Sequence, residues 1–167
     1  GSLKGGKNVF ALAKVKESFT ILGEDQVDSY LLFSNPHEYG KAIDVRFTPI
    51  RVVCNNTLTF SLEAKSKNAV KLNHRSVFNP DMVKEQMGIA SEKFAQYKEM
   101  AEFLSSRKFS VESLLQYYND VFPHREKREL QTEADLSRTA RQCYEVLETQ
   151  PGAEFGQGTW WQAFNSV

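Results

Sequence analysis

The sequence predicts an α+β fold, in which an N-terminal antiparallel strand meander with one packed helix is followed by a helical C-terminal half with one long helix. Before residue 80, several segments alternate apolar and polar residues, the period of a strand with one buried face. After residue 80, apolar residues recur at spacings of three and four, the period of a helix. A chain of 167 residues with 41% apolar content is long enough for one core, so we expect a single domain, residues 1–167.

The meander is predicted from alternation and turn residues. The segment 8–16 (NVFALAKVK) alternates apolar and polar residues, and turn residues fill the segment 34–40. Gly23-Glu24-Asp25 forms a further predicted turn, in which we expect both acidic side chains to be solvated. Strands are expected at residues 8–16, 19–22, 26–33 and 41–47, and a returning strand at 69–75 (AVKLNHR).

A change of period is predicted at Thr48-Pro49. Threonine is a favoured N-cap and proline is favoured at the first helical position, so we expect a helix from residue 50 to about residue 62. The start of such a helix offers unpaired backbone N–H groups, and Arg46 and Arg51 flank it, which indicates a candidate anion site. Alternatively, the two arginines pair with Asp44 or Glu63 and are structural.

Asn79-Pro80-Asp81 is a helix start signal, and a helix of about 25 residues is predicted after it. Its apolar seam is coiled-coil-like, at Val83, Met87, Ala90, Phe94, Tyr97, Ala101 and Leu104. The seam is longer than one short partner helix can cover. We therefore expect part of it to contact a later helix around Leu136 and Cys143, or another copy of the chain in a homo-oligomer.

Three shorter helices complete the prediction. Residues 110–122 form one, and residues 132–147 form another that opens with a capping box of Thr132 and Asp135. The segment 124–129 (HREKRE) between them is expected to be a solvated charge run. A last helix opens with Thr159 and two tryptophans and ends after about two turns, so we expect the chain to be a fragment of a longer protein.

Composition narrows the classes of function. No apolar run reaches the roughly 20 residues of a membrane helix, and the two cysteines are too few for a disulfide framework, which favours a cytoplasmic protein without a membrane partner. The sequence contains no nucleotide-binding or metal-binding motif, so no cofactor, metal or catalytic residue is assigned. An enzyme that uses Cys54, Asn56 and His74 stays open as an alternative, although a packed Cys54 is the more ordinary state.

Charge is distributed unevenly along the chain. Residues 1–76 contain 11 Lys or Arg and 7 Asp or Glu, whereas residues 77–167 contain 10 and 14. A polyanion would therefore meet the first half. We expect the basic residues between positions 41 and 75 to gather on one face. The candidate nucleic-acid-binding residues are Lys41, Arg46, Arg51, Asn56, Lys65, Lys67, Lys71 and Arg75.

Five segments together resemble the phage/plasmid-like protein family, a domain family of unknown function (domain of unknown function 932). They are FALAKV, DSYLLFSN, RFTPIRVVCNNTL, KLNHR and GTWWQAFNSV. The resemblance implies an origin in a mobile element and supplies no catalytic residues. The order of a meander, a helix and a helical half is also similar in outline to phage single-strand annealing proteins.

We therefore expect a non-enzymatic nucleic-acid-binding protein of a phage or plasmid, which binds or anneals single-stranded DNA and acts in recombination. Such binding needs a positive surface and aromatic stacking platforms. The candidate platforms are Tyr30, Phe33, Tyr39 and Phe47, although aromatic residues in strands are more often part of a core. The alternative is an oligomeric structural or host-interaction protein of a mobile element.

Overall fold

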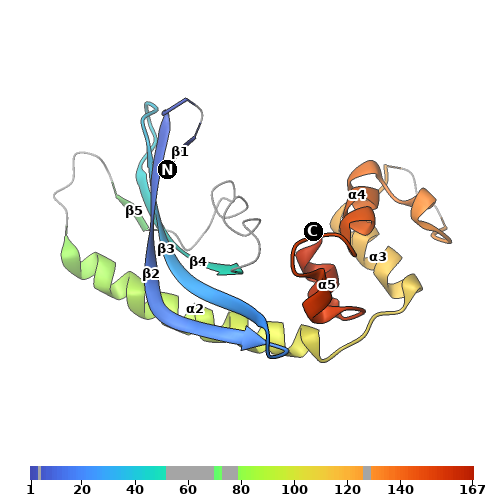
Figure 1. Ribbon diagram of the computed structural model, residues 1–167. Coiled ribbons are helices and arrows are strands. Elements are labelled where there is room, and N and C mark those ends of the chain that lie inside the picture. Colours follow the sequence, from blue (N-terminus) through green and yellow to red (C-terminus); the bar gives the residue numbers. More distant parts are fainter. Residues whose placement is uncertain (4, 52–69, 73–78, 126–128) are drawn as a thin grey trace. The chain divides into compact units, whose positions relative to one another are not determined.

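The computed structural model describes residues 1–3, 5–51, 70–72, 79–125 and 129–167 (Figure 1). It confirms the α+β class: a five-stranded sheet in the N-terminal part is followed by helices. The described chain divides into two compact units. The sheet unit comprises residues 1–20 and 26–99, and the helical unit comprises residues 21–25 and 100–167. The expectation of a single domain stays a prediction.

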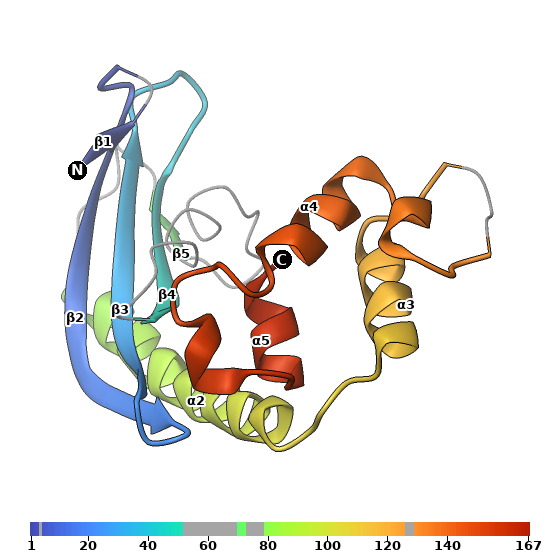
Figure 2. The same ribbon diagram turned by 45° about the vertical axis from the view of Figure 1, so that its right-hand side comes forward.

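The strands lie in the order β1-β2-β3-β4-β5, which Figure 2 shows from one side of the sheet. Their bounds are Ser2–Leu3 for β1, Asn8–Ile21 for β2, Asp25–Pro36 for β3, Ile43–Arg51 for β4 and Val70–Leu72 for β5. The pairs β1/β2, β3/β4 and β4/β5 are antiparallel. The predicted meander is thus confirmed, and the segments 8–16 and 19–22 form one continuous strand.

The helix predicted from residue 50 is wrong at its start, because Thr48 to Arg51 continue β4. An unbroken register pairs β4 with β3 from Ser34 opposite Asp44 to Val27 opposite Arg51. Proline is tolerated in a strand where its nitrogen is not needed by a neighbour, and Pro49 lies beyond the three residues of β4 that pair with β5. The rest of that predicted helix, residues 52–62, lies outside the described residues.

The turn between β2 and β3 uses two left-handed residues. Leu22 has φ 52° and Gly23 has φ 83°, and the N–H of Glu24 donates to the carbonyl of Ile21 at 3.3 Å. Positive φ values at both central positions are typical of a tight hairpin, and glycine is favoured there. The expectation that Asp25 is solvated is wrong. Its side chain is fully buried and accepts a hydrogen bond from Nε1 of Trp161 at 2.7 Å.

The long helix α2 spans Pro80–Ser105, as predicted, and Asn79 caps it by accepting the N–H of Asp81. Phe94 is 5% exposed, and its ring centroid lies 5.0 Å from that of Phe19 on β2 and 5.9 Å from that of Phe47 on β4. Ser91 donates to the carboxylate of Glu17 on β2. The central part of the apolar seam therefore packs on the sheet.

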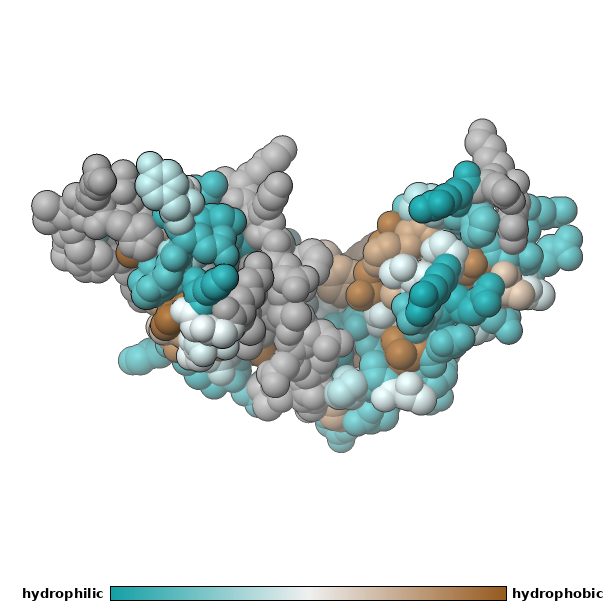
Figure 3. All heavy atoms as spheres, turned by 90° about the horizontal axis from the view of Figure 1, so that it is seen from above, coloured by the Kyte–Doolittle hydropathy of each residue, from teal (hydrophilic) through white to brown (hydrophobic). Residues whose placement is uncertain are grey.

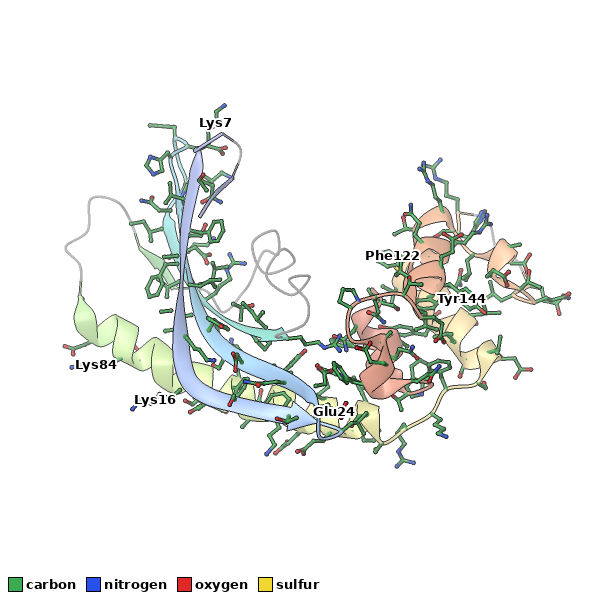
Figure 4. The ribbon with its side chains drawn as sticks, in the orientation of Figure 1. Lys7, Lys16, Glu24, Lys84, Phe122 and Tyr144 are labelled. Atoms are coloured by element: carbon green, nitrogen blue, oxygen red, sulfur yellow. The ribbon has the colours of Figure 1, made fainter. Side chains whose placement is uncertain are left out.

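The core of the helical unit lies between α3 (Val111–Val121), α4 (Arg138–Val146) and α5 (Trp160–Asn165). Leu114, Tyr118, Ala140 and Cys143 are buried in it. Figure 4 labels Phe122 and Tyr144, which pack against this core. Leu136 and Cys143 belong to the same core cluster as residues of α3, and the expected contact of the seam with this region or with another copy stays a prediction.

The helix predicted for residues 132–147 is divided in two. Thr132 and Asp135 form the predicted capping box, but it opens only a short 3-10 helix, η1, at Glu133–Asp135. Ser137 then caps α4 by accepting the N–H of Ala140, and its hydroxyl donates to the carbonyl of Phe122. A second strong N-cap residue within the predicted helix explains the interruption.

The last helix, α5, forms where predicted, with Thr159 at its N-cap and a short 3-10 helix, η2 (Ala153–Gly156), before it. Two side-chain hydrogen bonds stabilise its N-terminus. The side chain of Gln162 accepts the N–H of Gly158, and the hydroxyl of Thr159 donates to the carbonyl of Gly156. Among the described residues, none of the helices has the length and apolar character needed to cross a membrane.

Candidate nucleic-acid interface

The two units have formal net charges of opposite sign. The sheet unit contains 14 Lys or Arg and 9 Asp or Glu, a net charge of +5, whereas the helical unit contains 7 and 12, a net charge of −5. This separation is sharper than the one between the two halves of the sequence. A polyanion is therefore attracted to the sheet unit and repelled by the average charge of the helical unit.

The structure describes four of the eight candidate residues. Lys41 is exposed and lies 3.7 Å from the carboxylate of Glu38, and Lys71 on β5 is exposed. Arg46 makes two hydrogen bonds to Asp44, at 2.6 and 2.7 Å, and Arg51 is only 3% exposed. The other four candidates, Asn56, Lys65, Lys67 and Arg75, lie outside the described residues, as do Cys54 and His74 of the enzyme alternative.

The expectation that these basic residues share one face is wrong for Arg51. Side chains alternate along a strand, so Arg46 and Arg51 on β4 lie on opposite faces of the sheet. Arg51 shares its face with Phe47, the face on which α2 packs. Lys71 is paired with Asp44 and therefore lies on the same face as Arg46. The candidate anion site at a helix start before Arg51 does not form, because this segment is a strand.

Arg46 and Asp44 form a closed ion pair. Both side chains are largely buried, 12% and 14% exposed, and the guanidinium donates through two nitrogens to the two carboxylate oxygens. This geometry satisfies the carboxylate with parallel charge-assisted hydrogen bonds. The alternative interpretation of Arg46, a structural pair with Asp44, is thus confirmed.

A second buried carboxylate, that of Asp28, lies on the same face of the sheet as Arg46 and binds Lys14. Asp28 is 4% exposed and accepts hydrogen bonds from Nζ of Lys14 and from Nε2 of Gln26. Burial alone would raise the pKa of Asp28, but these two donors outweigh burial and lower the pKa of the carboxyl below its ordinary value. The hydrogen bond to Asp28 raises the pKa of Lys14. Lys14 therefore has a structural partner despite its exposed side chain.

Three exposed lysines of the sheet unit make no ion pair with any residue that the structure describes. They are Lys7 just before β2, Lys16 on β2 (both labelled in Figure 4) and Lys71 on β5. Lys7 and Lys16 lie outside the densest run of basic residues, so the density of charge along the sequence did not identify them. The alternation of the segment 8–16 was the available signal, since it assigns Lys14 and Lys16 to polar positions of a strand.

The four candidate stacking residues divide between core and surface. Phe47 packs against Phe94, and Phe33 lies half-buried on the same face as Phe47. Tyr30 is half-buried on the opposite face, since it is paired with Thr48. Tyr39 is fully exposed in the connection between β3 and β4, two residues before Lys41. Among the described residues, Tyr39 is thus the candidate that offers a bare ring to a ligand.

Comparisons with known proteins give a family and no activity. Within the described residues there is no group of three or more His, Cys, Asp or Glu side chains arranged to hold a metal ion. No curated protein and no solved structure matches the chain. The family model described as "Domain of unknown function (DUF932)" matches residues 1–167, the whole sequence. The chain therefore belongs to the DUF932 family.

Proposed function

We propose that this chain is a non-enzymatic nucleic-acid-binding protein, and that its sheet unit contacts the phosphates of a single strand through exposed lysines. The observation that carries the proposal is the net charge of +5 on the sheet unit. Binding of nucleic acid is dominated by lysine and arginine contacts to phosphates, which release counterions. The same proposal includes a role in single-strand annealing or recombination for a phage or plasmid, and this part rests on the sequence resemblance.

Lys7, Lys16 and Lys71 are the proposed phosphate contacts. Each is exposed, and none makes an ion pair with a described residue, so no structural partner has to be displaced when a phosphate binds. Arg46 is a poorer phosphate contact, because its guanidinium already donates hydrogen bonds to both carboxylate oxygens of Asp44. Arg46 and Arg51, which were predicted from the sequence to bind nucleic acid, are therefore not among the proposed phosphate contacts.

A preference for single strands over duplexes is proposed for Tyr39. Its ring is fully exposed and lies near Lys41 in sequence. Unpaired bases can stack on such a ring, which contributes about 1–3 kcal/mol per base, whereas the bases of a duplex already stack on one another. Stacking on Tyr39 would add affinity without changing the number of phosphate contacts.

Fluorescence anisotropy with a labelled single-stranded oligonucleotide, measured over a range of salt concentrations, tests these roles. Each change of Lys7, Lys16 or Lys71 to Ala should lower the slope of log affinity against log salt by about 0.7. The matched control is Lys108→Ala, which removes the same charge from an exposed lysine of the helical unit and should leave the slope unchanged. Tyr39→Ala should weaken binding at a constant slope.

Two outcomes would contradict the proposal. If the protein does not bind the single strand at low salt, the lysines have another role. If Lys108→Ala lowers the slope as much as the three sheet-unit variants do, binding follows total charge and the sheet unit is not the interface.

The expected homo-oligomer stays a prediction. Its main support was an apolar seam that exceeded its partners, and Phe94 in the middle of this seam is covered by Phe19 and Phe47 of the same chain. Light scattering of the protein at several concentrations measures the oligomeric state directly.

A further inference from the structure

The helical unit contains a groove between the end of α3 and the start of α4. Its volume is about 560 Å³, and Phe122, Pro123, His124, Arg125 and Arg138 are among the residues that line it. A neighbouring depression of about 380 Å³ shares His124 and Arg138 and adds both Arg141 and Glu145. Such volumes are typical of sites for small molecules, which occupy roughly 300–1,000 Å³.

The charge of the groove is opposite to that of its unit. The helical unit has a net charge of −5, yet among the residues that the structure describes no Asp or Glu lines the larger groove, whereas Arg125 and Arg138 do. Both arginines are exposed and make no ion pair with any residue that the structure describes. Two guanidiniums that line the same groove repel each other, and a bound anion offsets this repulsion.

The walls of the groove are fixed by hydrogen bonds. The hydroxyl of Ser137 at the start of α4 donates to the carbonyl of Phe122 at the end of α3 at 2.8 Å, and this bond joins the two walls. The N–H of Phe122 donates to Tyr118 at 2.9 Å. Arg141 donates to the carbonyls of Glu133 and Ala134, which ties the smaller depression to η1. A site with fixed walls loses little freedom when a ligand binds.

The groove combines apolar and cationic residues. Val121, Phe122 and Pro123 form the apolar side, and the half-buried ring of Phe122 also packs against the core of the unit. The same mixture of apolar and hydrophilic residues is visible on the face of the helical unit drawn in Figure 3. An aromatic ring and two arginines that line one groove are complementary to a planar base that carries a phosphate, because guanidinium groups bind phosphate oxygens in pairs.

From this geometry we infer that the groove between α3 and α4 binds one nucleotide, with its phosphate on Arg125 and Arg138 and its base against Phe122. The inference concerns a site in the helical unit and does not depend on the proposed lysine contacts of the sheet unit. The nucleotide is either free or part of a strand. Both sources have the same chemistry at this site, and the experiment separates them.

Calorimetric titration of the full chain tests the site with four probes: adenosine monophosphate, inorganic phosphate, a single-stranded oligonucleotide and polyglutamate. We expect adenosine monophosphate to bind and inorganic phosphate to compete with it. The double change Arg125→Ala and Arg138→Ala should weaken nucleotide binding by about tenfold or more, since a hydrogen bond to a charged group contributes about 1.5–3 kcal/mol. The single change Arg138→Lys should keep only part of the wild-type affinity for the nucleotide, because lysine keeps the charge but loses the paired donors.

The matched control is Arg107→Ala, an exposed arginine of the same unit that does not line the groove, and it should bind nucleotide like the wild type. Phe122→Leu should reduce the affinity for adenosine monophosphate while that for inorganic phosphate stays constant. If the oligonucleotide binds and adenosine monophosphate does not, and if this binding depends on the same two arginines, the nucleotide at the site is part of a strand.

Three results would overturn the inference: no binding of either nucleotide probe, equal binding by the double variant, or tighter binding of polyglutamate, which would indicate an acidic peptide. The sheet-unit changes of Lys7, Lys16 and Lys71 should not affect binding of adenosine monophosphate. Failure of this site and failure of the proposed function are thus distinguishable.

Discussion

Replacing Phe94 with alanine tests the assignment of the α2 seam to the core of the sheet unit. Phe94 is 5% exposed and its ring meets those of Phe19 and Phe47, so the substitution leaves a cavity between helix and sheet. Changes of a buried phenylalanine to alanine lower the free energy of unfolding by about 3–5 kcal/mol. Of this, each lost ring pair accounts for about 0.5–1.5 kcal/mol. Urea denaturation followed by circular dichroism measures the difference.

Phe103→Ala is the matched control for Phe94→Ala. It makes the same change on the same helix, but Phe103 is 58% exposed and contacts only the guanidinium of Arg107 among its described ring contacts. A loss of about 0.5–1 kcal/mol is expected, the contribution of an exposed cation–π contact. If Phe94→Ala destabilises no more than Phe103→Ala, or if it changes the mass measured by light scattering without changing stability, Phe94 is not part of this core.

Three further predictions follow from other buried groups. Trp161→Phe removes the indole N–H that Asp25 accepts and should lower the free energy of unfolding by about 1–3 kcal/mol in urea denaturation; an unchanged value would show that the bond contributes nothing. The pKa of Asp28 is lowered in the folded protein, so its contribution to stability is present above the ordinary aspartate pKa of about 3.9 and is lost as pH falls through the lowered value. Melting curves of wild type and Asp28→Asn should therefore differ most near neutral pH and converge in acid; a constant difference would contradict this linkage. Burial raises the pKa of Cys143, so its thiol should react with a thiol reagent only as the helical unit opens, and rapid labelling of the native protein would contradict its burial.

Local signals in the sequence were sufficient for most helices and strands. Ser110 with its capping partner Ser113, and Asn79 before Pro80, mark helix starts that the structure confirms. Alternation identified the strands of the meander. These features depend on neighbours in the chain, which is why one sequence suffices to predict them.

The start of the helix after Thr48 was predicted wrongly because Thr-Pro is compatible with two structures. Thr48 and Ile50 are β-branched and pair with β3, and pairing across the sheet outweighs a local capping preference. The burial of Asp25 was missed for a related reason. Its partner, Trp161, is 136 positions away, and no local pattern connects them.

The candidate interface was predicted only in part. The basic character of the N-terminal part persists in the sheet unit, but a count of charges does not say which arginine already has a partner. Arg46 is occupied by Asp44, two positions away on the same face, and Arg51 faces the opposite side. The groove residues Arg125 and Arg138 were overlooked, because they come to line one groove only when the ends of α3 and α4 pack together.

The salt dependence of single-strand binding by one triple variant tests the central claim most directly. If Lys7, Lys16 and Lys71 are phosphate contacts, changing all three to alanine should lower the slope of log affinity against log salt by about 2, at an unchanged melting temperature. A triple variant that binds with the slope of the wild type would contradict the claim that the sheet unit is the nucleic-acid interface.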